Sequence, residues 1–330
     1  MKAILNRLIG QESLSRAEAG MVLTEMAGGK YNTSQMAAFV TIYLMRAIKL
    51  EELQGFRDAM LDLCVPVEVS DFDAMDLCGT GGDGKDTFNI STLSSFVVAG
   101  AGQNVVKHGN YGVSSLCGSS NVLEFMGCKF TSDIDSIKRS LDRAGICFLH
   151  APLFHPAMKN IAPVRKELGI KTFFNMLGPM VNPAKPGKQL VGVFSLELAR
   201  LYGYIYQQTD KQFGIVHALD GYDEVSLTGD FKLIDHRHET ILSPDDLGLP
   251  TLKQEQLHGG TTIQESADIF KNVLNGKGTD AQRSAILANA GLALAVANEL
   301  DVRSGVQLAA TSLDSGAAMN SFKKFIEENS

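Results

Sequence analysis

The 330-residue chain has no tryptophan, few cysteines and no C-x-x-C pair. The five cysteines are Cys64, Cys78, Cys117, Cys128 and Cys147. An odd number without paired spacing argues against a zinc ribbon and a disulfide framework. The cysteines therefore indicate reduced thiols in a cytoplasmic protein.

Long hydrophobic runs and an excess of positive charge are also missing. The longest apolar run, FVVAGAG at residues 96–102, is too short to span a bilayer. Residues 1–20 carry charges inside their apolar stretch, which argues against a signal peptide. The formal charge of −7 and the pI near 5.5 disfavour nucleic acid or a membrane as a partner.

What the chain does contain is a hydrophobic content of 45% with 20% charged residues, enough for a large core and more than one domain. Residues 1–65 are expected to be entirely helical. The motif SRAE at residues 15–18 predicts a capping box, and apolar helical patterns follow at residues 19–29, 32–48 and 50–64.

From about residue 74, short apolar runs alternate with helical patterns. Strands are expected at residues 74–79, 104–109, 146–151, 189–194 and 213–219, with helices at 89–102, 119–127, 133–145, 195–209, 266–276 and 279–300. Alternation at this spacing predicts βαβ units and a mostly parallel central sheet. The predicted fold class is therefore α/β, with a small helical domain beside a larger α/β domain.

The proline-rich segment 152–186 interrupts this alternation. We expect part of it to return to the N-terminal helices, which gives a discontinuous helical domain of residues 1–70 with 160–186. The α/β domain then comprises residues 71–159 with 187–330. Ligands of open α/β sheets bind beyond the carboxyl ends of the strands, so that edge, facing the helical domain, is the expected site.

The glycine-rich stretch DLCGTGGDGKDT at residues 76–87 matches two phosphate-loop patterns without satisfying either. A dinucleotide fingerprint needs an acidic residue at the end of the next strand, where Lys107 and His108 stand instead. A P-loop needs Ser or Thr after the lysine, where Asp86 stands.

The glycines still allow several amides to form an anion nest, followed by a helix start at NIST, residues 89–92. Asn89, Ser91 and Thr92 add short polar side chains, and Asp83 can accept from a sugar hydroxyl. The combination favours a sugar phosphate. The alternative is a ligand-free turn in which Asn89, Ser91 and Thr92 only cap the helix.

A second loop, KHGNYGVSSLCGSS at residues 107–120, ends the next strand. Lys107 and His108 bring a cation and a donor to the same edge of the sheet. Side chains that can wrap an anion follow, at Asn110, Ser114, Ser115 and Ser119. A solvated polar loop is the alternative interpretation.

Two further groups of residues point to ligands. Asp223 and Glu224 in GYDEV follow an expected strand, and paired carboxylates suit Mg²⁺, although adjacent acids are also common in solvated turns. In the proline-rich segment, Arg165 can bind a carboxylate bidentately or lie on a helix surface, and His155 lies nearby in sequence.

Four long motifs occur in an order that resembles one family. They are GTGGDGKDTFNIST at 79–92, KHGN with SSLCGSSNVLE at 107–124, HPAMKNIAPVRKELGIKTFFNMLGP at 155–179, and DGYDE at 220–224. Together they resemble anthranilate phosphoribosyltransferase, in the nucleoside phosphorylase/phosphoribosyltransferase fold family. The resemblance implies a homodimer that transfers the phosphoribosyl group of phosphoribosyl pyrophosphate (PRPP) to anthranilate with two Mg²⁺ ions, releasing pyrophosphate, in tryptophan biosynthesis.

The resemblance also assigns roles to residues. It implies PRPP contacts from Gly79, Gly82, Asp83, Thr87, Asn89, Ile90, Ser91, Thr92, Lys107, His108, Gly109, Asn110, Tyr111, Gly112, Val113, Ser114, Ser115 and Ser119. Anthranilate would meet Gly79, Asn110, His155 and Arg165, and the metal would meet Ser91, Asp223 and Glu224. No dedicated general base is expected, and Lys107, His108 and Arg165 would act by positioning and charge.

The chain departs from the family pattern in three places. Tyr111 stands where arginine is usual, Asn121 where aspartate is common, and Lys171 where arginine is common. One alternative is a pyrimidine nucleoside phosphorylase, which shares the KHG loop but has no need of the acid pair or the segment around Arg165. The other is a non-catalytic, nucleic-acid-binding paralogue, which would have a basic groove and no acid pair.

Overall fold

The computed structural model describes residues 1–112 and 117–330, which divide into two compact units. The helical unit comprises Met1–Pro66 and Ala151–Pro183, and the α/β unit comprises Val67–His150 and Ala184–Ser330. The domain boundaries expected from sequence stay a prediction, because compactness alone does not show that a unit folds independently.

The helical unit contains seven α-helices among its described residues. They are α1 (Lys2–Ile9), α2 (Arg16–Ala27), α3 (Thr33–Met45), α4 (Leu50–Asp62), α8 (Ala151–Phe154), α9 (Ala162–Leu168) and α10 (Phe174–Leu177). Capping boxes start two of them: Ser15 pairs with Glu18 at α2, and Asn32 pairs with Gln35 at α3. Each box satisfies backbone donors that the first turn of a helix leaves without partners.

Aromatic side chains explain why a distant segment belongs to the helical unit. Phe173 stacks on Phe56 of α4 with ring centroids 4.5 Å apart, and its ring meets Tyr43 of α3 edge-on at 5.2 Å. Phe39 joins the same cluster. Burying these large rings together stabilises the association of segment Ala151–Pro183 with the first four helices.

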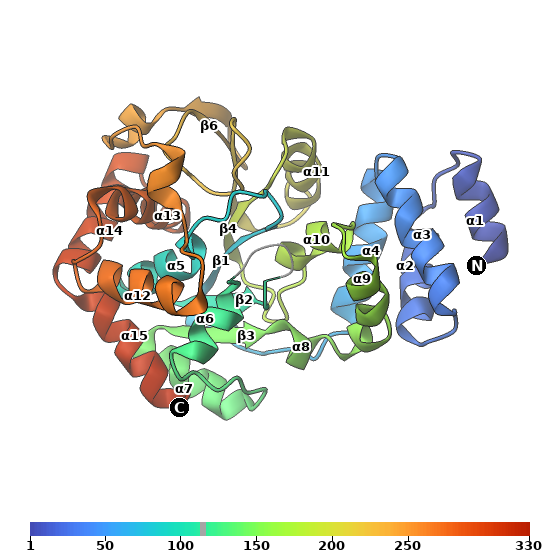
Figure 1. Ribbon diagram of the computed structural model, residues 1–330, viewed down its shortest axis with the longest axis horizontal. Coiled ribbons are helices and arrows are strands. Elements are labelled where there is room, and N and C mark those ends of the chain that lie inside the picture. Colours follow the sequence, from blue (N-terminus) through green and yellow to red (C-terminus); the bar gives the residue numbers. More distant parts are fainter. Residues whose placement is uncertain (113–116) are drawn as a thin grey trace. The chain divides into compact units, whose positions relative to one another are not determined.

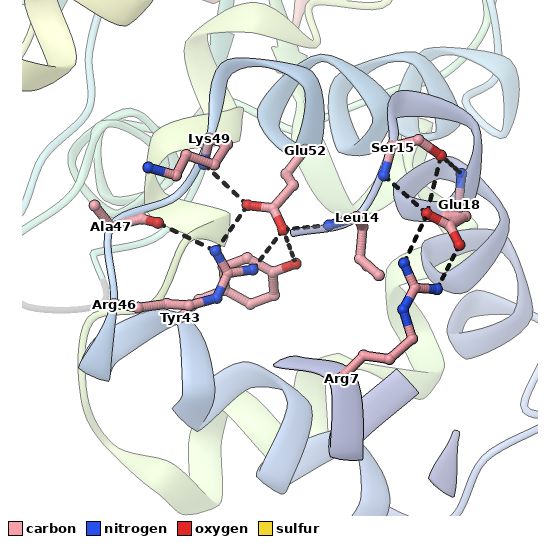
Figure 2. Close-up of polar contacts among 9 residues, drawn as sticks. All are labelled: Arg7, Leu14, Ser15, Glu18, Tyr43, Arg46, Ala47, Lys49 and Glu52. Atoms are coloured by element: carbon pink, nitrogen blue, oxygen red, sulfur yellow. Dashed lines mark hydrogen bonds and ion pairs between the residues drawn. The ribbon is translucent and has the colours of Figure 1, made fainter. Parts of the chain in front are cut away.

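A buried carboxylate joins three parts of the helical unit (Figure 2). Glu52 of α4 is fully buried, and its carboxylate accepts hydrogen bonds from several donors. These are the backbone N–H groups of Leu14 and Lys49, each at 2.9 Å, the Tyr43 hydroxyl at 3.1 Å and the Arg46 guanidinium. Because the Arg46 side chain is itself only 7% exposed, neither charge of this pair retains much hydration.

The α/β unit is built around one seven-stranded sheet. Its strands are β1 (Met75–Gly79), β2 (Val105–Gly109), β3 (Ile146–His150), β4 (Lys188–Gly192), β5 (Gln212–Ala218), β6 (Phe231–Asp235) and β7 (Glu239–Leu242). Its α-helices are α5 (Ile90–Gly100), α6 (Ser119–Phe125), α7 (Ile134–Ala144), α11 (Leu196–Tyr206), α12 (Ile263–Leu274), α13 (Asp280–Asn298), α14 (Val302–Asp314) and α15 (Ala317–Glu328). Figure 1 shows α12 to α15, in orange and red, grouped around α5.

The strand order is β3-β2-β1-β4-β5-β6-β7, with β1 to β5 parallel and β6 and β7 antiparallel. The predicted mostly parallel sheet and the predicted fold class are confirmed. The two antiparallel strands and the helices α14 and α15 were not predicted. β6 and β7 pair antiparallel with β5 and with each other, a connection that the alternation of apolar runs and helical patterns does not indicate.

The chain turns in opposite directions on the two sides of β1, because β2 and β3 lie on one side and β4 and β5 on the other. β1 pairs with β4 from Met75 to Gly79, whereas its register with β2 is the pair Met75–Val105. A ligand in an open α/β sheet binds at such a reversal of strand order.

Among the described residues, no single helix is both long and apolar enough to cross a membrane. Helices α13 and α14 satisfy length and composition only as a pair bent by 117°.

Candidate active site

The carboxyl ends of β1, β2 and β5 bring three of the predicted motifs of the α/β unit to one edge of the sheet. β1 ends at Gly79 and continues into the glycine loop, and β2 ends at Gly109 in the KHG motif. The acid pair follows β5 after a turn in which Gly221 N–H donates to the carbonyl of Ala218. These strands are parallel, so their carboxyl ends share that edge.

The glycine loop turns sharply because Gly81, Gly82 and Gly84 all have a positive φ, between 64° and 76°. Close approach also requires glycine at the start of the loop: a Cβ on Gly79 would lie 2.4 Å from Oδ2 of Asp223. The loop can therefore lie directly against the acid pair, which a side chain at residue 79 would prevent.

The two carboxylates of the acid pair are bound by backbone amides of the glycine loop and of helix α5. Gly81 N–H donates to Oδ2 of Asp223 at 2.6 Å, and Ser91 N–H donates to Oε1 of Glu224 at 3.0 Å. The Thr87 hydroxyl lies 3.4 Å from Oε2 of Glu224. Amides that were predicted to form an anion nest thus bind anions supplied by the protein itself.

The start of α5 has no cap from its own sequence. Asn89 is the N-cap residue, but its side chain makes no capping bond; its amide donates instead to the carbonyl of Cys117 at 2.9 Å. Ile90 and Thr92 in the first turn of α5 are buried. The capping alternative therefore does not account for Asn89, and Glu224 fills the capping role from another part of the chain.

Three acidic side chains, those of Asp83, Asp223 and Glu224, lie close together at this edge. Burial raises the pKa of the Asp223 carboxyl to about 7, with a further contribution from the charge of Asp83. Burial, and then the charges of Asp223 and Asp83, raise the pKa of Glu224. Among residues 1–112 and 117–330, no ion pair joins either acid to a cation.

This donor set fits a hard divalent cation. Carboxylate and hydroxyl oxygens are the ligands that Mg²⁺ prefers, and a cation here would relieve the repulsion between the acids. The described residues contain no group of three or more His, Cys, Asp or Glu side chains that could hold a metal by themselves. A cation at this edge would accordingly complete its shell with water or phosphate oxygens, as Mg²⁺ commonly does.

Lys107 and His108 occupy buried positions on β2. The Lys107 ammonium donates to the carbonyl of Leu77 at 2.6 Å and lies 3.4 Å from the Ser91 hydroxyl. Burial lowers the pKa of Lys107, and the charge of Asp76 is the largest influence in the opposite direction. His108 N–H donates to Oδ1 of Asp76 at 3.3 Å, so this buried acid contacts the backbone of the KHG motif.

The described ends of the second loop are tied to helix α6. Oδ1 of Asn121 accepts from the N–H groups of Gly112 and Gly118, at 2.9 and 3.0 Å, as an aspartate would. The Ser119 hydroxyl donates to the carbonyl of Asn110 at 3.2 Å. Three predicted PRPP contacts of this loop lie outside the described residues: Val113, Ser114 and Ser115.

Tyr111 has contacts of its own at the position where arginine was expected. Its hydroxyl donates to Oε1 of Glu124 at 3.2 Å, and its ring meets that of His150 edge-on at 4.9 Å. The His150 Nδ1 is in turn 2.9 Å from the hydroxyl of Ser120. Tyr111 thus links the loop to α6 and to the end of β3.

The remaining predicted residues belong to the helical unit. Arg165 of α9 is partly buried, and its guanidinium lies 5.2 Å from the ring centre of Phe174. No ion pair with an acid involves Arg165 among the described residues. Burial lowers the pKa of His155 to about 4, so this imidazole is neutral at pH 7.

Sequence reasoning missed two residues that support the site. Asn289 of α13 binds the backbone of Val225, the residue after the acid pair. Asp76 is a fully buried acid in the middle of an apolar strand. In both cases the available signal was a polar residue inside an apolar pattern, because such residues need specific partners when buried.

Family models define the class of protein. The α/β domain model of a glycosyl transferase family matches residues 71–319, and its helical bundle domain model matches residues 2–64. The protein is thus a glycosyl transferase with both of the family's domains.

Relatives identify the branch of that class. An anthranilate phosphoribosyltransferase of Christiangramia forsetii is 59% identical over 324 residues, 98% of each chain. The crystal structure of the Thermus thermophilus enzyme of the same name matches with 31% identity, 98% of each chain and a TM-score of 0.91. The Saccharomyces cerevisiae enzyme, solved in complex with PRPP and Mg, matches with 27% identity, 98% of this chain, 96% of the other and a TM-score of 0.91.

The chain belongs to the anthranilate phosphoribosyltransferase family, and the resemblance inferred from its motifs is confirmed. None of these relatives is named a nucleoside phosphorylase or a nucleic-acid-binding protein.

Proposed function

We propose that this protein transfers the 5-phosphoribosyl group of PRPP to the amine of anthranilate in L-tryptophan biosynthesis. The products are N-(5-phosphoribosyl)anthranilate and pyrophosphate. The observation that carries the proposal is the contact of the acid pair with the glycine loop and the start of α5. This contact supports the proposal because backbone N–H donors and carboxylate oxygens lie side by side, as a pyrophosphate bound with a divalent metal requires.

We assign Asp223, Glu224 and the Ser91 hydroxyl to Mg²⁺, and we propose two ions. Support comes from the two carboxylates, which form no ion pair among the described residues, and from the Saccharomyces cerevisiae relative in complex with PRPP and Mg. Bound there, Mg²⁺ supplies positive charge that stabilises the departing pyrophosphate.

The phosphoribosyl pyrophosphate contacts are assigned to the two loops and the helix start. The set with described positions is Gly79, Gly82, Asp83, Thr87, Asn89, Ile90, Ser91, Thr92, Lys107, His108, Gly109, Asn110, Tyr111, Gly112 and Ser119. Backbone amides fixed in place before the substrate arrives stabilise developing negative charge without further reorganisation. Asp83 accepts from a ribose hydroxyl, since a carboxylate would repel phosphate.

In the reaction, the bond from C1 of the ribose to the pyrophosphate oxygen breaks as the bond from the anthranilate nitrogen to C1 forms. Positive charge develops on the sugar ring, and pyrophosphate leaves with the bonding electron pair. The aromatic amine of anthranilate is neutral at pH 7, so it attacks without a strong base and loses its proton to solvent. The protein's main contributions are positioning and electrostatic stabilisation.

Anthranilate is assigned to Arg165, His155, Asn110 and Gly79. Arg165 supports this assignment because it has no ion pair with an acid among the described residues, so its guanidinium is available to a substrate carboxylate. His155 is neutral at pH 7, so in this assignment Arg165 supplies the positive charge for that carboxylate.

We also propose that the enzyme is a cytoplasmic homodimer. The five free thiols support the location. Exposed apolar side chains on the helical unit support self-association, chiefly Ile9, Met21, Leu44 and Met45. Light scattering would give the mass in solution, and a monomer at micromolar concentration would contradict the assembly.

Anthranilate fluorescence tests the reaction directly. The signal should fall when the protein, PRPP and Mg²⁺ are all present, and should persist when any one is omitted. An unchanged signal with all components and an intact fold would disprove the proposed function.

A further inference from the structure

Helix α13 carries a buried amide in an otherwise apolar stretch. Asn289 lies between Ala288 and Ala290 and is only 6% exposed. Its neighbours on the helix are mostly alanine and leucine. Burying a primary amide is costly unless its donors and acceptor find partners, so the partners of Asn289 indicate why it is there.

Asn289 binds both backbone groups of one residue. Its Oδ1 accepts from Val225 N–H at 3.0 Å, and its Nδ2 donates to the Val225 carbonyl at 2.9 Å. The same Nδ2 donates to the carbonyl of Ala285, one turn earlier, at 2.8 Å. The side chain thus gives Val225 the two bonds that a neighbouring strand would otherwise provide.

Val225 directly follows Glu224, and the acid pair lies outside the strands of the sheet. On the N-terminal side of the acid pair, the carbonyl of Tyr222 accepts a hydrogen bond from Ala218 N–H at 3.1 Å. The Asp223 carbonyl packs so closely on β4 that a Cβ on Gly192 would lie 1.4 Å from it. The two acids are therefore held between the end of β5 and the amide of α13.

We propose that Asn289 is a positioning residue for the divalent cation, because it fixes the backbone from which Asp223 and Glu224 reach the metal. The inference rests on the proposed function of the acid pair, and Asn289 touches neither substrate nor metal in it. Residues that orient metal ligands typically change metal affinity by about 10- to 100-fold when they are replaced. The same loss is expected at Asn289.

A purely structural role predicts a different result. If Asn289 only packed α13 against its neighbours, its loss would lower stability and leave metal affinity unchanged. Asn298, an exposed residue at the end of the same helix, is a control for the loss of an asparagine from α13. Its Nδ2 also donates to a carbonyl one turn earlier, that of Leu294 at 3.0 Å, but no hydrogen bond joins it to the acid segment in the described structure.

The experiment compares Asn289→Ala, Asn289→Leu and Asn298→Ala with the wild type. Leucine fills the volume of the amide without its hydrogen bonds, so it separates packing from positioning. MnCl₂ serves as the probe, since Mn²⁺ takes similar oxygen ligands and its free ion is measured by electron paramagnetic resonance. Circular dichroism checks the fold, and steady-state kinetics at saturating Mg²⁺ gives KM for anthranilate.

Both Asn289 variants should raise the Kd for Mn²⁺ by about 10- to 100-fold, with KM for anthranilate within about twofold of wild type. Asn298→Ala should bind Mn²⁺ normally. Wild-type Mn²⁺ affinity in a folded Asn289 variant would overturn the inference, as would an equal loss in Asn298→Ala. Failure of the proposed function is distinguishable, because the wild type itself would then leave anthranilate fluorescence unchanged.

Discussion

Glu52 of the helical unit is fully buried and Glu224 of the α/β unit is partly buried, and the surroundings of the two carboxylates differ. Glu52 accepts from two backbone amides and the Tyr43 hydroxyl, and it pairs with Arg46. Glu224 accepts from the Ser91 amide and lies beside two further acids. Among residues 1–112 and 117–330, no ion pair with a cation includes Glu224.

These different surroundings indicate that the two carboxylates have different roles. The charge of Glu52 is balanced inside the protein, so it connects helices and offers nothing to a ligand. The charges of Asp223 and Glu224 are balanced only in part, which is the usual condition of residues that bind a ligand or metal. Breaking each site should therefore change a different property.

The largest effect is expected for the double variant Asp223→Asn with Glu224→Gln. Turnover that depends on Mg²⁺ should fall by at least about 1,000-fold, because amides bind a hard cation far less well than carboxylates. The free energy of unfolding should stay equal or rise, since two repelling charges are removed. Near-normal activity of the double variant at low Mg²⁺ would refute the metal assignment.

Glu52→Gln should have the opposite profile. Removing one partner of a buried ion pair leaves Arg46 without its counter-charge and should cost about 3–5 kcal/mol of unfolding free energy. The kcat of the protein that remains folded should be unchanged. Urea unfolding monitored by circular dichroism measures the first quantity, and activity at low temperature measures the second. A stable but inactive variant would contradict the comparison.

Arg165→Ala tests a positive charge that, unlike Arg46, has no acid partner among the described residues. Losing a charge-assisted contact with the anthranilate carboxylate should cost about 2–4 kcal/mol. This corresponds to a loss of about 30- to 1,000-fold in kcat/KM for anthranilate. Titration calorimetry should find PRPP binding preserved, and Arg165→Lys should restore only part of the activity. Equal losses for both substrates would indicate disrupted structure instead.

The contact between Glu224 and Ser91 predicts competition between two anions. Without metal, Glu224 occupies a donor assigned to PRPP, so removing it should tighten pyrophosphate binding. In EDTA, Glu224→Ala should bind inorganic pyrophosphate about tenfold more tightly than wild type, about 1.4 kcal/mol. Glu224→Gln should fall between the two, because its neutral oxygen still accepts from Ser91 N–H.

Calorimetry in EDTA distinguishes this competition from simple repulsion, which predicts equal affinities for the alanine and glutamine variants. Asp86→Asn is the matched control for charge. Asp86 is an exposed acid of the same loop, and its positive φ of 48° is tolerated by asparagine. This variant should leave pyrophosphate affinity close to that of wild type.

The smallest effect is expected for Tyr111→Arg. An added cation beside a polyanion is worth about 0.5–1 kcal/mol at a partly solvated position. The new side chain would lose the contact with His150 but keep access to Glu124, so the KM for PRPP should fall by about two- to fivefold. A large loss of activity would show that the ring contact with His150 is required.

The sequence was informative wherever neighbouring residues determine the outcome. The five parallel strands follow from short apolar runs, and the capping box at Ser15 follows from its local motif. The glycine loop and the acid pair were recognisable because their residue types suit phosphate and metal. The site assignments themselves stay predictions until the experiments above are done.

The parts that could not be predicted depend on contacts between distant residues. Asn89 has the side chain of a helix cap, yet it binds Cys117 while Glu224 caps α5 from 133 residues away. The hydrogen bonds of Asn289 form only when α13 is packed beside Val225, so its role is not recognisable from the sequence. Strands β6 and β7 gain stability by pairing with β5 and with each other, which their own sequences do not reveal.

The divided chain of the helical unit has a consequence for synthesis on the ribosome. Residues Met1–Pro66 emerge first, but Phe173, which stacks on Phe56, is made only after β1, β2 and β3. Until then the rings of Phe39, Tyr43 and Phe56 lack a major packing partner and stay available to chaperones. The helical unit, which leaves the ribosome first, is thus completed only after strands β1 to β3 of the α/β unit have been synthesised.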